Sequence, residues 1–315
     1  MSFAERLDPE IAAIIDLLPR FDLTDIPSAR AQRAALAQTT LATAVRRDDV
    51  IAEDRVVGDH GARMRLYRRR AATPDLPAPA LVWVHGGGHV LGAIDQDDPL
   101  METVAATMGC VCLSVDWRQA PEHPYPAALD DAWAVLRHAF NEAAALGIDP
   151  RRIAIGGASS GGGVAAALAL RARDAGGPQP CFQWLVYPML DDRGITKSSR
   201  TITDSRIWND DCNRRGWAAY LGELSGGDAV PAYAAPARAT DLSGLPPAFI
   251  GTGDLDLFVD ENIAYAQALL DGDVPVELHV YPGAVHGFDL FAPDATVSRR
   301  FRADRDGALA RALNA

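Results

Sequence analysis

The first part of the chain has the hydrophobic spacing of helices. Apolar side chains recur every three or four residues over 3–18, which predicts an amphipathic helix. Ser2 and Glu5 form a capping box at its start, and Pro19 follows its end. A second helical pattern covers 28–44.

From residue 50 onwards the pattern becomes that of strands. Two alternating runs, 50–57 and 63–68, are joined by Gly58-Asp59-His60-Gly61, which predicts a hairpin. Buried strands and helices then alternate. The expected strands lie near Leu81, Val111, Ile153, Phe182, Ala248 and Val276, and the helices near Met101, 127–144, 164–173, 260–270 and 298–313. This alternation predicts an α/β fold with a mostly parallel, eight-stranded sheet flanked by helices.

A serine lies on a glycine-rich turn between one of these strands and the next helix. The turn is Gly157-Ala158-Ser159-Ser160-Gly161. A G-x-S-x-G turn at such a place is typical of a nucleophile elbow, where a Cβ on either glycine would clash. Ser159 fits better than Ser160, because only Ser159 has glycine two residues before and two after it. The alternative is a turn whose glycines serve only close strand–helix packing.

An α/β-hydrolase requires a glycine-rich loop before such a serine, and an acid and then a histidine after it. His85-Gly86-Gly87-Gly88 comes directly after the strand near Leu81, Asp256 follows the strand near Ala248, and His286 follows the strand near Val276. Catalytic groups collect at the carboxyl ends of strands in open α/β sheets. These positions therefore predict a Ser159–His286–Asp256 triad.

Three aspartates compete for the place of the triad acid. Asp254 lies close to the end of its strand, and Asp260 is already in the next helix. Asp256 lies on the loop between them and is free to turn toward His286. We therefore expect Asp256 to orient the imidazole.

One stretch, 190–235, interrupts the alternation of strands and helices. It contains no expected strand, and a structureless loop of this length is uncommon in a compact domain. Its large apolar side chains are Trp208, Trp217, Tyr220 and Leu221. We expect a small helical insertion that, with residues 1–45, forms a cap over the active site. The catalytic domain then comprises 46–189 and 236–315.

Composition and charge exclude several functions. A formal net charge of −12 argues against nucleic acid and against stable association with anionic membranes. No stretch approaches the length of a membrane span. The four cysteines, Cys110, Cys112, Cys181 and Cys212, lack the spacing of metal ligands and suit a reducing compartment. We therefore expect a cytoplasmic protein without a metal.

Together these motifs resemble the hormone-sensitive-lipase-like carboxylesterases, the bacterial family IV esterases of the α/β-hydrolase superfamily. The shared features are the glycine loop 85–88, the block 116–131, the elbow, the Asp256 loop and His286-Gly287-Phe288. The chain departs from the family at Ala158 and Ser160 in the elbow, and at His89, where the family often has an aromatic or bulky apolar residue.

The resemblance implies an α/β-hydrolase fold with a helical cap and a carboxylesterase that needs no cofactor. It places the oxyanion hole at the backbone N–H groups of Gly87, Gly88 and Ser160. The expected substrates are small or short-chain esters, and a homodimer would suit the architecture. Related acyl hydrolases, which cleave amides, lactones or carbamates, remain alternatives. A ligand receptor on this fold is disfavoured, because such proteins lose a triad member.

Other polar residues near these motifs are expected to be structural. His85 should orient the glycine loop by hydrogen bonding. Arg118, Glu122 and Asp131 should form a salt-bridge network beneath that loop. The acidic cluster Asp95, Asp97 and Asp98 is expected to cap a helix start rather than to bind a metal.

Overall fold

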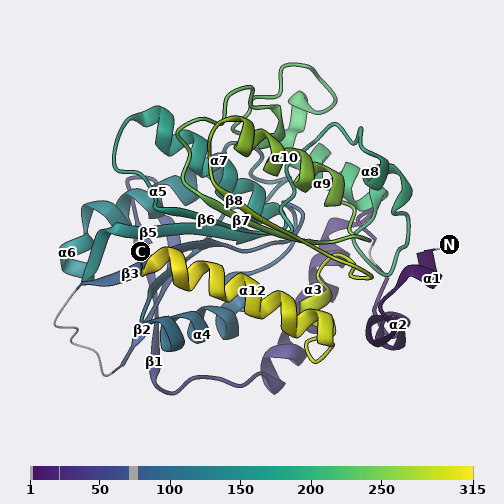
Figure 1. The fold of residues 1–315 in the computed structure, drawn as a ribbon, viewed down its shortest axis with the longest axis horizontal. Coiled ribbons are helices and arrows are strands. Elements are labelled where there is room, and N and C mark those ends of the chain that lie inside the picture. The colour runs from purple at the N-terminus through teal and green to yellow at the C-terminus, as the bar shows by residue number, and fades with distance from the viewer. Residues whose placement is uncertain (1–2, 21, 71–76, 315) are drawn as a thin grey trace.

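One mixed sheet organises the molecule. The computed structural model describes residues 3–20, 22–70 and 77–314, and within them eight strands form a sheet of order β1-β2-β4-β3-β5-β6-β7-β8 (Figure 1). Strand β2 is antiparallel to β1 and β4, and the other neighbours are parallel. The strands are β1 (Val50–Val57), β2 (Ala62–Arg69), β3 (Ala78–Val84), β4 (Val111–Asp116), β5 (Ile148–Ala158), β6 (Phe182–Val186), β7 (Ala248–Gly253) and β8 (Val276–Tyr281). The predicted sheet is confirmed.

Helices cover both faces of this sheet, which is why its central strands β3 and β6 are buried along almost their whole length. One face is covered by α4 (Asp98–Met108) and α12 (Thr296–Leu313), and the other by α5 (Ala127–Asn141), α7 (Ser160–Ala175) and α10 (Val259–Asp271) (Figure 1). The short elements are α6 (Ala143–Leu146), α11 (Phe288–Phe291), η1 (Ile94–Asp97), η2 (Gly222–Leu224) and η3 (Pro236–Arg238).

The N-terminal helix differs from its prediction. It is broken into α1 (Phe3–Arg6) and α2 (Pro9–Ile15). Asp8 starts the second helix, because its carboxylate accepts hydrogen bonds from the backbone N–H groups of Glu10 and Ile11, and Pro9 occupies the first helical position. The predicted cap residue Ser2 lies outside the described residues.

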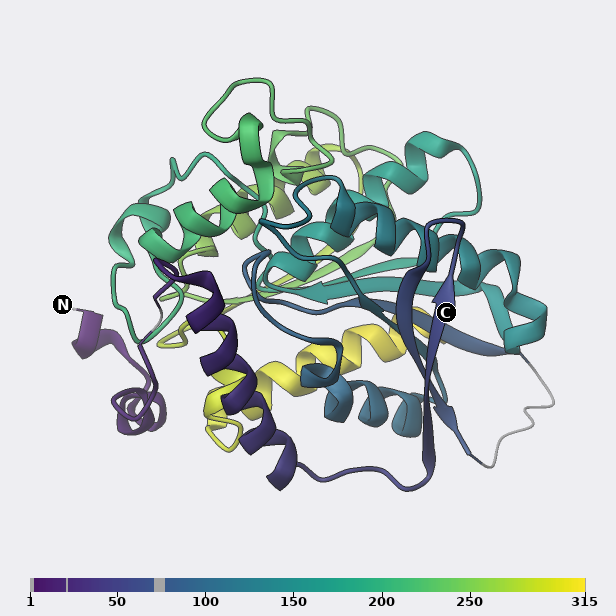
Figure 2. The same cartoon turned by 180° about the vertical axis from the view of Figure 1, so that it is seen from behind.

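Three helices gather where the parallel strands end. They are α3 (Ile26–Thr43), α8 (Lys197–Thr201) and α9 (Asp210–Leu221) (Figures 1 and 2). The last two belong to the stretch 190–235, all of which is described and none of which is strand. Its four large apolar side chains are buried as expected.

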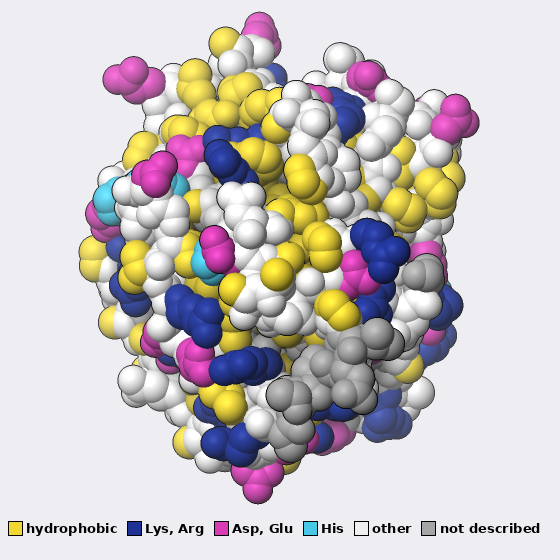
Figure 3. All heavy atoms as spheres, turned by 90° about the vertical axis from the view of Figure 1, so that its left-hand side faces the viewer, with side chains coloured by type: hydrophobic (Ala, Val, Ile, Leu, Met, Phe, Trp, Pro, Cys, Tyr) yellow, Lys and Arg dark blue, Asp and Glu magenta, His cyan; other side chains and the backbone are white. Residues whose placement is uncertain are grey.

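The opposite end of the molecule carries the C-terminus and α6. On that face basic and acidic side chains are interspersed among apolar ones (Figure 3). No helix in the described part of the chain is long and apolar enough to cross a membrane.

Candidate active site

Ser159 lies on a sharp turn that only glycine neighbours permit. It has φ +55° and ψ −123°, between the end of β5 and the start of α7. A Cβ on Gly157 would overlap the carbonyl oxygen of Gly161, and a Cβ on Gly161 would overlap that of Val84. A side chain at either position would therefore push the elbow away from the sheet.

A chain of hydrogen bonds leads from this serine to a buried carboxylate. Nε2 of His286 is 3.0 Å from Oγ of Ser159, and Nδ1 is 2.8 Å from Oδ2 of Asp256. The Asp256 side chain is fully buried, and its other oxygen accepts the backbone N–H of Phe258 at 2.9 Å. The rings of Tyr187 and Phe258 contact the imidazole edge-on, with centroid distances of 4.8 and 5.0 Å. The imidazole is thus held in one orientation.

The neighbouring aspartates have other partners. Asp254 accepts the backbone N–H of Gly283 at 2.6 Å and pairs with Arg6 at 3.0 Å. Asp260 accepts the backbone N–H of Ser198 at 2.8 Å. Of the three, the structure therefore brings only Asp256 to His286.

The glycine loop presents free backbone donors beside Ser159. The N–H groups of Gly87, Gly88 and Ser160 donate no hydrogen bond within the described part of the chain. Ser160 begins α7, whose first N–H groups have no partner inside the helix. Nδ1 of His85 donates to the carbonyl of Gly86 at 2.9 Å, which agrees with its expected role in orienting the loop.

The glycine loop, the elbow and the sheet match those of known proteins. A model of a family with the alpha/beta hydrolase fold matches residues 81–290. The carboxylesterase NlhH of Mycobacterium tuberculosis is 38% identical over 314 residues, which cover 98% of this chain and 97% of the relative. The chain belongs to the hormone-sensitive-lipase-like carboxylesterase family. As predicted from sequence, it is an esterase with the α/β-hydrolase fold.

Further relatives of the esterase agree. The esterase LipI of Mycobacterium tuberculosis is 36% identical over 289 residues, covering 91% of this chain and 89% of the relative. The solved structure of a bacterial heroin esterase is 40% identical, covers 100% of both chains and has a TM-score of 0.95. A hyperthermophilic esterase from Pyrobaculum calidifontis is 31% identical, with a TM-score of 0.88 over 98% of this chain and 100% of that chain.

In the esterase, helix α9 packs directly on the glycine loop. A Cβ on Gly88 would overlap the ring of Trp208, and a Cβ on Gly216 of α9 would lie 2.6 Å from the carbonyl oxygen of Gly88. His89, the next residue of the loop, stacks on Tyr220 of α9 with ring centroids 3.8 Å apart. Trp208 and α9 thus form a wall beside the free donors of the loop.

His89 is a polar residue within this aromatic wall. It is 1% exposed, and neither ring nitrogen has a hydrogen-bond partner among the described residues. Burial lowers the pKa of His89 to about 3. The sequence marked His89 as a departure from the family, but it gave no sign of this burial against α9.

The expected salt-bridge network beneath the loop is only partly present. Arg118 forms a bidentate pair with the buried carboxylate of Asp131, at 2.9–3.1 Å. Glu122 was expected to join them but instead pairs with Arg30 of α3 at 2.8 Å, and this hydrogen bond lowers the pKa of Glu122 to about 2. Arg30 is separated from Glu122 by 92 positions, so no local pattern could have predicted the pair.

The expected capping by the acidic cluster is wrong. Asp97 precedes α4 but its side chain makes no capping hydrogen bond, and it accepts Nε1–H of Trp83 instead, at 2.6 Å. Asp98 accepts hydrogen bonds from Tyr67, Arg65 and Arg46. Among the residues that the structure describes, no group of His, Cys, Asp and Glu side chains could hold a metal ion.

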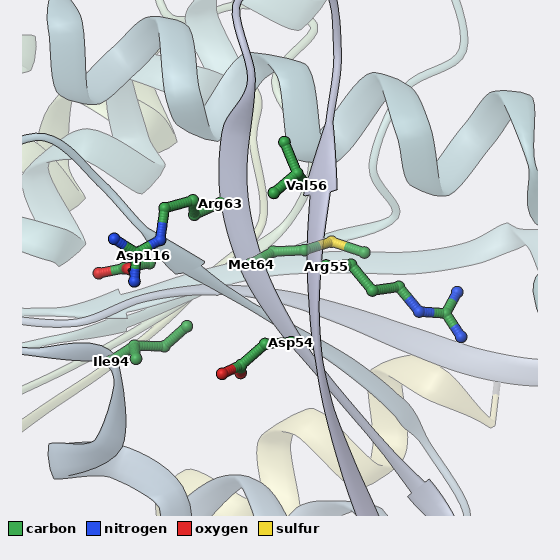
Figure 4. Close-up of a pocket in the computed structure, with 7 residues that line it drawn as sticks. All are labelled: Asp54, Arg55, Val56, Arg63, Met64, Ile94 and Asp116. Carbon is green, nitrogen blue, oxygen red and sulfur yellow. Dashed lines mark ion pairs between the residues drawn. The ribbon is translucent and has the colours of Figure 1, made fainter.

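A cavity of about 160 Å³ lies away from the triad, at strands β1, β2 and β4. Figure 4 shows the side chains that line it: Asp54, Arg55, Val56, Arg63, Met64, Ile94 and Asp116. Arg63 and Asp116 form an ion pair across 2.7 Å. Asp54 pairs with Arg65 and Arg55 pairs with Glu53, so all the charged groups that line this cavity are engaged in ion pairs.

Proposed function

We propose that this esterase hydrolyses small or short-chain carboxylic esters through an acyl-enzyme formed on Ser159. The observation that carries the proposal is the continuous hydrogen-bonded chain Ser159–His286–Asp256. In this order the imidazole can remove the serine proton while the carboxylate holds the tautomer with its proton on Nδ1.

The reaction then proceeds in two halves. Oγ of Ser159 attacks the ester carbonyl, and Nε2 of His286 takes the proton and passes it to the leaving alcohol. Water attacks the acyl-enzyme with the same imidazole as base, which releases the acid and restores the serine. The carboxylate of Asp256 stabilises the imidazolium that forms in each half.

The oxyanion of each tetrahedral intermediate is assigned to the N–H groups of Gly87, Gly88 and Ser160. Their lack of partners in the described chain supports this assignment. One such donor contributes about 3 kcal/mol to the stability of the transition state. No metal or organic cofactor takes part.

The preference for short acyl chains rests on the cap, which we assign to residues 1–45 and 190–235. The ring of Trp208 on Gly88 narrows the space beside the oxyanion hole. A narrow pocket of this kind suits small, soluble esters, and the resemblance to the family implies acyl chains of about two to eight carbons.

The state of the cysteines bears on the cellular compartment of the enzyme. All four cysteines are free, and three of them are buried, which supports a reducing compartment such as the cytoplasm. A homodimer through an edge of the sheet remains a prediction, with β1 and β8 as the two edge strands.

Two serine variants test the proposal. Ser159→Ala should abolish ester hydrolysis and labelling by a fluorophosphonate, because both need the nucleophile. Ser160→Ala should keep most activity, because only the backbone N–H of Ser160 is used and its Oγ has no hydrogen-bond partner among the described residues. An active Ser159→Ala variant would refute the mechanism.

A series of esters tests the substrate range. We expect hydrolysis of 4-nitrophenyl esters to be fastest for short acyl chains and to decline for long ones. A rate that rises steeply once long-chain triglycerides form micelles would show a lipase instead. Faster turnover of matched amides, lactones or carbamates would replace esters with that class of substrate.

A further inference from the structure

Helix α3 turns two arginines toward the protein and a leucine toward solvent. Its partly or fully buried positions recur at helical spacing and define one inward face. They are Ile26, Ala29, Arg30, Arg33, Ala37 and Leu41. Leu36, in contrast, is 39% exposed. Since removing a charge from water is strongly unfavourable unless the charge is paired, an arginine on this face calls for a partner.

Arg30 has such partners and fixes the helix in place. Its Nε donates to the carbonyl of Val90 at 2.8 Å, and one of its terminal nitrogens donates to the carbonyl of Ala120 at 2.8 Å. It also pairs with Glu122. This face of α3 is therefore attached to the segment that directly follows the glycine loop.

Arg33 lies one helical turn further along the same face and has no such partner. It makes no hydrogen bond and no ion pair with any residue that the structure describes. The charged or phenolic groups within electrostatic range of its guanidinium are Asp97 and Tyr187, and burial lowers the pKa of Arg33. An arginine still remains protonated in a protein. The face thus carries a positive charge that no ion pair neutralises.

One of these two neighbours, Tyr187, lies beside the triad. Tyr187 contacts the imidazole of His286 edge-on. Asp97 already accepts a hydrogen bond from Nε1–H of Trp83 at 2.6 Å, and the hydroxyl of Tyr187 donates to Asp289 at 3.0 Å. In the described part of the chain, neither neighbour forms a hydrogen bond or an ion pair with Arg33.

We propose that Arg33 binds a carboxylate of the substrate, so that the preferred esters carry a second, anionic group, as half-esters of dicarboxylic acids do. This proposal rests on the proposed ester hydrolysis. A guanidinium forms paired, charge-assisted hydrogen bonds with a carboxylate. With a net charge of −12, the protein as a whole repels anions, so that attraction must come from a local group such as Arg33.

Matched ester pairs test the proposal and show whether the carboxylate that Arg33 binds lies on the acyl side or on the alcohol side of the ester. For the acyl side, mono-4-nitrophenyl adipate is compared with 4-nitrophenyl hexanoate. For the alcohol side, 4-acetoxybenzoate is compared with 4-acetoxybenzamide. The quantity measured is the ratio of kcat/KM for the anionic ester to kcat/KM for its neutral partner, after subtraction of spontaneous hydrolysis.

Arg33→Met should lower this ratio about ten- to hundredfold for one of the two pairs, the loss of one charge-assisted contact. Hydrolysis of the neutral esters should change less than about twofold, and Arg33→Lys should restore part of the ratio. Arg214→Met is the control, because it removes the same charge from an exposed position on α9. We expect it to leave both ratios unchanged.

Several outcomes would overturn the proposal. Equal losses for the anionic and neutral esters would make Arg33 a purely structural residue. If Arg33→Met leaves both ratios unchanged while the neutral esters are still hydrolysed, carboxylate binding by Arg33 is refuted and the proposed ester hydrolysis stands. A wild-type enzyme that hydrolyses none of the esters would refute the proposed function, and this inference with it.

Discussion

Asp254 and Asp256 lie two residues apart on one loop, but their side chains have different partners. Asp256 meets His286, whereas Asp254 meets Gly283 and Arg6. Asp256→Asn should lower kcat about 10⁴-fold near neutral pH, because an amide favours the wrong imidazole tautomer. Asp254→Asn should cost much less. Turnover of one short-chain ester by both variants checks this, and a reversed order of losses would contradict the assignment of the acid.

The sequence predicted those site residues that have a recognisable pattern next to them in the chain. For Ser159 the pattern is its two glycines, and for Asp256 and His286 it is the strand that precedes each of them. The pairing of Arg30 with Glu122 has no such local sign, since it depends on how a distant helix packs. The same holds for Arg33, because nothing in the sequence around it shows that this side of the helix faces the protein.

At the scale of elements, the short helix α8 supports the loop that carries the triad acid. Oγ of Ser198 donates to the carbonyl of Leu257 at 2.8 Å and accepts the N–H of Asp260 at 3.4 Å. Ser198→Ala should let Asp256 move, lowering kcat about tenfold with little change in KM. Among the described residues, the hydrogen-bond partner of the Ser199 hydroxyl is the carbonyl of Thr196, in the same turn.

Ser199→Ala is therefore the matched control for Ser198→Ala. It should lower stability slightly and leave kcat unchanged. Kinetics at several pH values, alongside thermal unfolding of both variants, separate the two effects. Equal kcat for both variants would mean that α8 does not position the acid.

Strands and long helices were predictable because their hydrophobic period is repeated over many residues. The break between α1 and α2 was missed, although its sign is local: an aspartate directly before a proline is a strong helix start. The role of Asp97 was also mispredicted. Its side chain accepts a hydrogen bond from Trp83 and does not cap α4, and this contact joins elements that are separate in the sequence.

At the scale of the whole molecule, His89 links stability to pH. The folded pKa is about 3, below the ordinary value of 6.5, because burial disfavours the charged ring. As pH falls from 6.5 toward 3, the unfolded chain binds a proton that the folded chain does not, so stability is lost in this window. Between pH 7 and pH 5 this loss is about 2 kcal/mol.

His89→Phe should remove that part of the acid sensitivity. Phenylalanine preserves the stacking on Tyr220 and carries no proton. Urea unfolding of the wild type and the variant at both pH values measures the difference between their pH slopes. Parallel slopes would show that His89 is not the titrating group.

The backbone contacts around Ser159 also bear on how this enzyme could acquire new specificities. The carbonyl of Ala158 lies 2.8 Å from where a Cβ on Gly86 would stand, and the elbow glycines are equally confined. The nucleophile and the oxyanion loop thus form one interlocked unit, in which a single added methyl group disturbs both. Mutational libraries should therefore yield active variants from the side chains of α3, α8 and α9, and almost none from the glycines beneath them.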